Sequence, residues 1–350
     1  MTQPLLITSF GAVGDGKKDN TSIINEAAKV GKAQGQVVQV PAGKFLYSDL
    51  LTLDSVILEG VGPESVLYCK NYKRSAVYLK GNGAAIKNLK LSGDPTTDPA
   101  NRTAEWQTKR VLPYEATNWE ISGIVIDSGN SAAIQTYKAS KGKITKCTVG
   151  GNLADGIHIT DASSEIFIDN NDVFNTNDDC IAVVSPFGTL EVSHDIVATN
   201  NRVGNITHGR GMSIVGGKNI HYENNIISDV ENAAGLYLAQ ENAYNTYGIE
   251  NVVVLSCTII NSGETAKGHF AIMLFSDGAH KNKNVVLDHV FVLNDINEAG
   301  GIRVFSNHNE DISVLESVFN AKKPTQFDSP NVVVTPYRSG IIGYYGTDSL

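Results

Sequence analysis

Three aspartates carry the chemistry that this sequence could perform. Asp155 and Asp179 lie 24 residues apart, and Asp178 directly precedes Asp179. A structural repeat of that length would stack Asp155 and Asp179 on neighbouring coils, about 4.8 Å apart. Carboxylates at that spacing repel each other, so one of them tends to keep its proton and becomes a proton donor beside a base. An aspartate before glycine, as in Asp155-Gly156, also forms turns, but turn formation does not require the adjacent Asp178.

Five further residues are candidates for binding a substrate beside these carboxylates. Arg210 falls in the column of Asp155 and Asp179, where it could hold a sugar hydroxyl or carboxylate, or merely neutralise the aspartates. His208 lies just before the same strand. The remaining three form one outward-facing column: His158, Tyr237 and Arg303. Tyr237 could stack on a sugar ring or be a packed aromatic, and Arg303 could serve a distal subsite or be a solvated charge.

A repeated pattern of short apolar strands must position these residues. One series of strands begins at Ala132, Asp155, Asp179, Arg210, Ala234, Phe270 and Gly300. The second strand of each unit follows at Leu89, Ile124, Cys147, Asn171, Asn201, Asn225, Cys257, His289 and Ser317. The units recur about every 28 residues, and apolar residues alternate with polar ones within the strands. Such a period, with short strands and no helix between them, indicates a parallel β-helix.

The predicted fold is therefore all-β, a single-stranded parallel β-helix with a short N-terminal capping helix. An amphipathic segment over about 22–33, begun by Asp19 or Thr21, would cover the open end of the coils. The three asparagines of the second series, Asn171, Asn201 and Asn225, would stack and bond one another. We predict one domain over 1–350, with the cap segment at 1–45, the main coils at 80–320 and a tail at 321–350.

One long loop interrupts the repeat. Residues 94–119 hold both tryptophans, Trp106 and Trp119, together with several polar side chains: Arg102, Lys109, Arg110 and Tyr114. Long insertions in a solenoid usually lie on one face and shape a cleft. The loop is thus expected to border a binding surface.

Composition excludes several classes of protein. The 350 residues carry a net charge of −9 and include 33 Gly and 32 Asn, which favours strands and turns over a helical bundle. An acidic chain is a poor partner for nucleic acid. No apolar run is long enough to span a membrane, and no signal peptide is visible. The four cysteines have no metal-type spacing, so buried free thiols are expected, and no metal or other cofactor.

Two groups of motifs resemble known families. Phe10-Gly-Ala-Val-Gly-Asp-Gly16, with Val40-Pro-Ala-Gly43, resembles the N-terminal signature of the pectate-lyase superfamily of right-handed parallel β-helix proteins, which includes many viral tailspikes. Asn177-Asp-Asp-Cys-Ile-Ala182 and Gly209-Arg-Gly-Met-Ser-Ile214 are similar to motifs of the polygalacturonases, the family 28 glycoside hydrolases. That resemblance implies that Asp178 is the general acid, while Asp155 and Asp179 activate water and the configuration inverts.

Two positions depart from the polygalacturonase pattern. Arg210 replaces a histidine, and Leu236-Tyr-Leu-Ala239 stands where an Arg-Ile-Lys motif would bind a substrate carboxylate. We therefore expect a glycoside hydrolase whose polysaccharide or oligosaccharide substrate is not plain galacturonan. The alternatives are a polysaccharide lyase or epimerase acting on a uronate polymer, and a non-catalytic glycan-binding or tailspike-type adhesion protein. An extracellular or virion-associated location is expected, with a homotrimer if the protein is of viral type.

Overall fold

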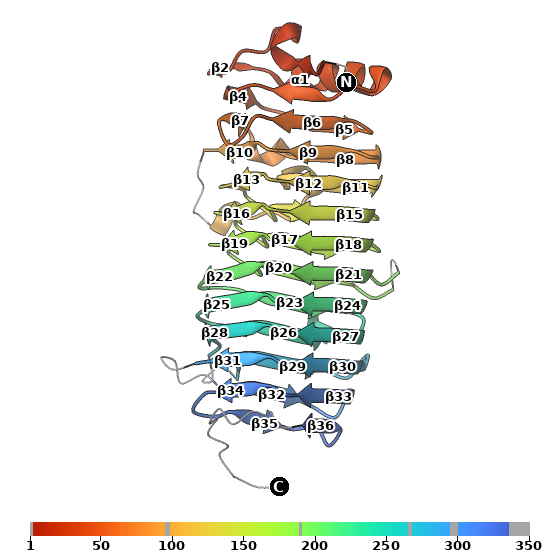
Figure 1. The fold of residues 1–350 in the computed structure, drawn as a ribbon, viewed down its shortest axis with the longest axis vertical. Helices are drawn as coiled ribbons and strands as arrows, with labels where there is room; N and C mark the ends of the chain where they lie inside the picture. Colours follow the sequence, from red (N-terminus) through yellow and green to blue (C-terminus); the bar gives the residue numbers. More distant parts are fainter. Residues whose placement is uncertain (1–2, 95–98, 189–190, 265–267, 295–299, 336–350) are drawn as a thin grey trace. The chain divides into compact units, whose positions relative to one another are not determined.

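The computed structural model describes residues 3–94, 99–188, 191–264, 268–294 and 300–335. These residues form parallel sheets wound into a solenoid-like β-helix, with one α-helix among them, near the N-terminus (Figure 1). The predicted fold class is confirmed. Two compact units are distinguished: Met1–His158 with Ser163–Thr176 (unit 1), and Ile159–Ala162 with Asn177–Leu350 (unit 2). The single domain over 1–350 stays a prediction, and residues 336–350 of the predicted tail lie outside the described residues.

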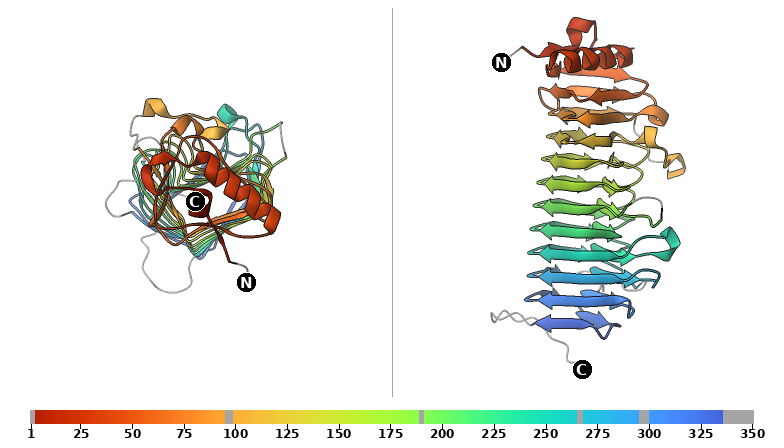
Figure 2. Two further views of the ribbon diagram at one scale, coloured as in Figure 1. Left: turned by 90° about the horizontal axis from the view of Figure 1, so that it is seen from above. Right: turned by 90° about the vertical axis from the view of Figure 1, so that its right-hand side faces the viewer.

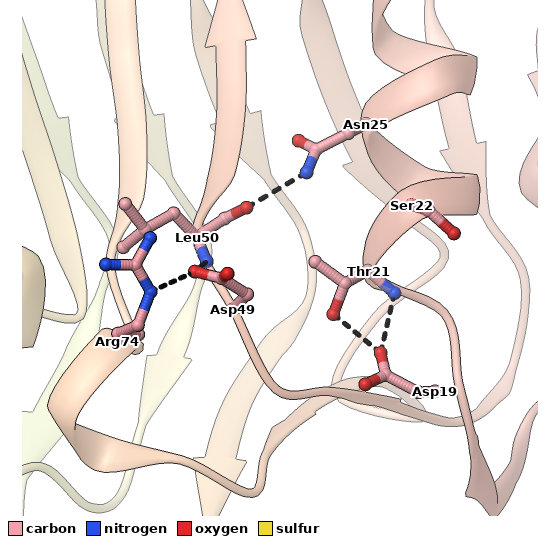
Figure 3. A pocket seen from close by; sticks show the side chains of 7 residues that line it. All are labelled: Asp19, Thr21, Ser22, Asn25, Asp49, Leu50 and Arg74. Atoms are coloured by element: carbon pink, nitrogen blue, oxygen red, sulfur yellow. Dashed lines mark hydrogen bonds and ion pairs between the residues drawn. The ribbon is translucent and has the colours of Figure 1, made fainter.

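The helix α1 (Thr21–Gln34) confirms the predicted cap and packs on strand β5 (Leu51–Asp54) of unit 1. Its buried face holds Ile24, Ala27 and Ala28. The residue at its N-cap is Asn20 and not one of the two predicted residues, although the Asp19 carboxylate accepts hydrogen bonds from Thr21 N (2.9 Å) and Thr21 Oγ1 (2.6 Å). Figure 3 shows these bonds, and Figure 2 shows α1 lying across the end of unit 1.

A complete coil of unit 1 contains three short strands that pair in parallel with strands of neighbouring coils, and the two coils nearest the N-terminus lack the first strand. The first strands are β5 (Leu51–Asp54), β8 (Val77–Asn82), β11 (Val111–Thr117), β14 (Ile134–Gln135) and β17 (Ile157–Thr160). The middle strands are β1 (Leu5–Leu6), β3 (Val38–Val40), β6 (Ile57–Gly60), β9 (Ala85–Lys87), β12 (Glu120–Ser122), β15 (Ser140–Thr145) and β18 (Ser164–Asp169). The third strands are β2 (Asp15–Asp19), β4 (Gly43–Tyr47), β7 (Ser65–Cys69), β10 (Lys90–Gly93), β13 (Val125–Ile126), β16 (Thr148–Gly150) and β19 (Asp172–Phe174). Regular coils thus begin before residue 80.

Unit 2 repeats the same three-strand coil. Its first strands are β20 (Ile181–Val184), β23 (Met212–Val215), β26 (Leu236–Gln240), β29 (Ile272–Ser276), β32 (Ile302–Phe305) and β35 (Thr325–Phe327). Its middle strands are β21 (His194–Thr199), β24 (Gly217–Glu223), β27 (Ile249–Leu255), β30 (Asn282–Asp288), β33 (Asn309–Leu315) and β36 (Val332–Thr335). Its third strands are β22 (Arg202–Ile206), β25 (Ile226–Val230), β28 (Thr258–Ser262), β31 (Phe291–Leu293) and β34 (Val318–Asn320). The three columns are visible in Figure 1.

The middle strand was missing from the two-strand unit that the sequence pattern predicts. A single residue in the left-handed conformation separates the middle strand from the third one, as at Lys146 (φ 55°), Asn170 (φ 54°) and Asn224 (φ 54°). Because such a one-residue bend leaves no run of turn residues in the sequence, the middle and third strands look like one apolar segment there. Asparagine adopts this conformation at low cost, which explains part of the asparagine excess.

Buried asparagines follow these bends and bond to neighbouring coils, and the predicted bond between asparagine side chains is confirmed for Asn201 and Asn225. In unit 1, Asn171 Oδ1 accepts from Cys147 N at 2.9 Å. In unit 2, Asn225 Oδ1 accepts from Asn201 N (3.0 Å) and Asn201 Nδ2 (2.9 Å). One predicted member of this column is wrong. Phe291 pairs with Thr258, so Val290 and not His289 is the equivalent of Cys257.

The interior of each unit is lined by the inward residues of the strands. Ile134 pairs with Ile157 in unit 1, Met212 with Leu236 in unit 2, and each is 1% exposed or less. Burial of such a side chain stabilises the fold by about 1.5–3 kcal/mol. All four cysteines are buried, and burial raises the pKa of the Cys147 thiol to about 12. Among the described residues, no helix is long and apolar enough to cross a membrane.

Candidate active site

Asp179 lies at the centre of a hydrogen-bonded network in unit 2. It sits two residues before Ile181, which pairs with Met212, so Asp179 and Arg210 occupy the same column as predicted. The Asp179 carboxylate is 4% exposed. It accepts a hydrogen bond from Arg210 N at 2.7 Å and another from the Ser213 hydroxyl. These donors favour the ionised form of the carboxylate.

Arg210 bridges two buried carboxylates. Its Nη1 lies 3.7 Å from Asp179 Oδ1, and its Nη2 lies 3.0 Å from Glu241 Oε1. Tyr237 donates its hydroxyl to the same Glu241 oxygen at 2.8 Å, and the guanidinium lies 4.4 Å from the Tyr237 ring centre. Burial alone would lower the pKa of Arg210, but the charges of Asp179 and Glu241 raise it above the ordinary value. Of the two predicted roles of Arg210, this geometry favours neutralisation.

Tyr237 does not offer a stacking surface for a sugar. Its side chain is 3% exposed, and burial, followed by the charge of Glu241, raises its pKa. The outward column nevertheless exists as predicted, because Tyr237 pairs with Met273 and Met273 pairs with Arg303. Glu241 binds the Tyr237 hydroxyl and the Arg210 guanidinium lies over the ring, and the sequence pattern gave no sign of either contact.

Asp178 and His208 lie next to this network. Asp178 is half-buried, and His208 is exposed at the turn before β23. Gly209 has φ +86°, and a Cβ there would stand 2.3 Å from the Asp178 carbonyl carbon. The glycine therefore lets the turn pack directly on Asp178. It does not leave room for a bulky substrate at this turn.

A cavity of about 440 Å³ opens beside Arg210 in unit 2. Its lining includes stacked rings of Tyr237 and Phe275, 6.4 Å apart, and of Phe275 and Phe305, 5.3 Å apart. Arg303 lies at the cavity two coils beyond Tyr237, as predicted, and its Nη2 contacts Asp328 at 3.0 Å. Both arginines of the lining are thus paired with carboxylates. The cavity combines apolar surface with arginines whose charges are paired.

In unit 1, the candidate residues Asp155 and His158 contact each other. His158 Nδ1 lies 2.6 Å from Asp155 Oδ2, and both side chains are mostly buried. The Asp155 carbonyl accepts hydrogen bonds from Ala133 N (2.9 Å) and Asn152 Nδ2 (2.6 Å). These bonds fix the turn that presents the carboxylate. A histidine held by a carboxylate in this way is a suitable proton carrier.

Lys109 of the predicted insertion lies close enough to Asp155 for their charges to interact. The structure bounds the insertion by β10 and β11, so Trp119 belongs to the core at 1% exposed, and residues 95–98 lie outside the described residues. Lys109 Nζ donates to Ser131 Oγ at 2.6 Å and to the Ala104 carbonyl at 3.2 Å. Burial lowers the pKa of Lys109 to about 8, although the charge of Asp155 acts to raise it.

Because Lys109 is buried, the stability of the protein should vary with pH in the alkaline range. A fall from the ordinary value of 10.5 to about 8 means that the unfolded state binds more protons between these two values. The free energy of unfolding should therefore rise by about 3 kcal/mol as the pH rises through that interval, and level off on both sides. Chemical denaturation across this pH range gives the free energy of unfolding of the wild type and of Lys109→Met. The difference between the two proteins checks the prediction, because the titration of other groups cancels in it. Equal pH profiles for the two proteins would contradict it.

Two residues of these networks escaped the sequence reasoning. Glu241 directly follows β26 and is 8% exposed, and Lys109 lies inside the insertion. The available signal for Glu241 was an acidic residue at the end of a strand in the repeat, one coil after Arg210. A lone lysine among several polar loop residues gave no signal that it would be buried.

Comparisons with known proteins agree with this architecture. A family model described as "Rhamnogalacturonase A/epimerase, pectate lyase-like" matches residues 6–237. No curated protein sequence matches. The catalytic domain of a GH87 α-1,3-glucanase in complex with nigerose has a TM-score of 0.75 at 18% identity, covering 92% of this chain and 67% of that one. The mannuronan C-5 epimerase AlgE6 A-module of Azotobacter vinelandii has a TM-score of 0.68 at 17% identity, covering 95% and 98%. At these identities the likeness shows the fold alone.

Proposed function

The chain belongs to the rhamnogalacturonase A/epimerase, pectate lyase-like family, and on that premise we propose that it hydrolyses a glycosidic bond of a polysaccharide. Asp178 is the general acid that protonates the glycosidic oxygen. Asp179 and Asp155 activate the attacking water, and the anomeric configuration inverts. The grouping of Asp155 with the other two carboxylates rests on the coil spacing of the sequence, 24 residues between Asp155 and Asp179.

One observation carries this proposal: two adjacent carboxylates experience different surroundings. Asp179 is 4% exposed and accepts hydrogen bonds from Arg210 N and the Ser213 hydroxyl. Asp178 is half-buried beside the turn that holds His208. Neighbouring carboxyl groups in unlike environments can divide the roles of acid and base between them. His158, bonded to Asp155, supports proton movement on the water side.

The paired arginines support a neutral substrate. Recognition of a uronate requires a cation that is available to its carboxylate. Arg210 is held by Asp179 and Glu241, and Arg303 by Asp328. The cavity beside them presents the half-buried rings of Phe275 and Phe305, which stack 5.3 Å apart. An uncharged glucan of the kind that the GH87 α-1,3-glucanases cleave fits this chemistry, and galacturonan does not.

A lyase or epimerase is the second candidate, because the family description and the mannuronan epimerases both include that chemistry. Proton abstraction at C5 needs a base. Arg210 is unsuited to that role, because its carboxylate neighbours raise its pKa. His158 would have to act as the base instead. The third candidate, a non-catalytic adhesion protein, requires no base at all.

A polysaccharide panel separates the three candidates. The purified protein is incubated with α-1,3-glucan, other neutral glucans, galacturonan, rhamnogalacturonan and mannuronan, with and without a chelator. We expect new reducing ends from a neutral glucan, unaffected by chelator, and products heavier by one water per cleavage. Ultraviolet-absorbing unsaturated products would indicate a lyase, and a changed uronate composition without cleavage would indicate an epimerase. Absence of turnover on the whole panel would support adhesion and overturn the proposal.

A further inference from the structure

Three aromatic rings form a rigid cluster on unit 1, outside the residues assigned to catalysis. Tyr114 and Tyr137 stack at 4.7 Å with an interplanar angle of 17°, on neighbouring coils joined by a parallel bridge. Trp106 stands across both, at 5.0 Å and 69° from Tyr137 and at 6.4 Å and 83° from Tyr114. We call Trp106, Tyr114 and Tyr137 the aromatic platform. All three side chains are half-buried, so part of each ring meets solvent.

The insertion holds Trp106 in this position. Thr103 N donates to the Asn130 carbonyl at 3.1 Å, and Ser131 Oγ donates to the Thr103 carbonyl at 2.6 Å. At the other end of the segment, Lys109 Nζ donates a hydrogen bond to Ser131 Oγ at 2.6 Å. The 3-10 helix η4 (Trp106–Thr108) lies between these anchors. The ring is therefore ordered before any ligand arrives, which lowers the entropic cost of binding.

The platform adjoins the coil that carries Asp155. Gln135, two residues before Tyr137, pairs with His158, and His158 contacts Asp155. Ala133 N also donates to the Asp155 carbonyl at 2.9 Å. Ala132 lies opposite Asp155, and Tyr137 follows five residues later. A polymer chain whose scissile bond lies at Asp155 would therefore reach the platform after roughly 16 Å along the strand direction and about one coil, roughly 5 Å, along the stack.

We propose that the aromatic platform is a sugar-binding subsite for this polymer, in which Trp106 packs against a pyranose ring. The apolar C–H face of a pyranose complements the electron-rich face of an indole. Tyr114 and Tyr137 are positioning residues that support the indole from behind. Their own rings approach Lys80 and Lys138, at 5.1 Å and 5.3 Å, which leaves Trp106 as the ring that takes the sugar. This inference rests on the proposed polysaccharide substrate and not on the proposed catalytic roles.

Intrinsic fluorescence tests the inference without requiring turnover. The chain has two tryptophans, and Trp119 is 1% exposed, so a ligand on the platform reports through Trp106. The probes are linear neutral oligosaccharides, beginning with an α-1,3-linked glucose tetrasaccharide, titrated into the Asp178→Asn variant. We expect a saturable fluorescence change that disappears in Trp106→Phe. Calorimetry should show binding about tenfold weaker in Trp106→Ala, close to wild type in Trp106→Phe, and unchanged in Phe167→Ala, a matched exposed aromatic of unit 1.

The outcomes separate this inference from the proposed function. Binding that depends on Trp106, together with a wild-type protein that hydrolyses no polysaccharide of the panel, would support the subsite and overturn the hydrolase. Equal affinity of wild type and Trp106→Ala, with both proteins folded by circular dichroism, would overturn the subsite while the hydrolase stands. A fluorescence change that persists in Trp106→Phe, or no binding of any probe to wild type, would also overturn the subsite.

Discussion

Replacing Asp178 with Asn is expected to lower kcat on the cleaved polysaccharide by about 10²- to 10⁴-fold. The amide cannot donate the proton that the leaving glycosidic oxygen requires, while its shape and neighbours are nearly unchanged. KM should stay within about threefold, because the loss falls on the transition state and not on ground-state binding. Initial rates of reducing-end release over a range of substrate concentrations give both constants.

The control for Asp178→Asn is Asp229→Asn, an exposed aspartate of unit 2 at φ 55°, a conformation that asparagine adopts readily. This variant should retain wild-type kcat. A substrate with a good leaving group, such as an aryl glycoside of the same sugar, should restore part of the Asp178→Asn rate, because such a group departs without protonation. Wild-type kcat in Asp178→Asn would remove Asp178 from the acid role.

Replacing Arg210 with Met is expected to destabilise the protein by about 3–5 kcal/mol. The substitution leaves Asp179 and Glu241 without their shared cation, and their side chains are only 5% and 11% exposed. Two buried carboxylates then repel each other without compensation. Thermal and chemical denaturation at neutral pH measure the loss.

A double-mutant cycle identifies the source of that loss. Glu241→Gln in the Arg210→Met background should restore part of the stability, because one uncompensated charge is removed. Arg303→Met is the matched control, since its partner Asp328 is 38% exposed and its loss should cost no more than about 1 kcal/mol. Full stability of Arg210→Met, with only KM raised, would instead assign Arg210 to substrate binding.

The repeat, the cap helix and the stacked columns could all be predicted from sequence, because a solenoid imposes one spacing on every coil. That spacing alone predicts Arg210 beside Asp179 and Arg303 two coils beyond Tyr237, and the strand register agrees with both positions. The middle strands could not be recognised in the sequence. A single left-handed residue, such as Asn170 or Asn224, separates each of them from the third strand, where a run of turn residues would usually mark the boundary.

Side-chain surroundings were less predictable than the positions along the backbone. Tyr237 lies in the predicted outward column, but Glu241, directly after β26, and the guanidinium of Arg210 contact its side chain. Lys109 looked like any loop lysine, yet its contacts with Ser131 and Ala104 bury it. Both outcomes depend on loops whose path no repeat dictates. In this fold, the burial and the contacts of side chains in insertions and at loop ends are therefore the features that the sequence predicts least well.

The measurement that tests hydrolysis most directly is digestion of the cleaved polysaccharide in heavy-oxygen water, followed by mass spectrometry of the products. Hydrolysis by the proposed aspartates predicts one heavy oxygen in each new reducing end, introduced by the wild type and lost in parallel with activity in Asp178→Asn. Products that carry no heavy oxygen and have a mass lower by one water would show elimination, and would contradict the account.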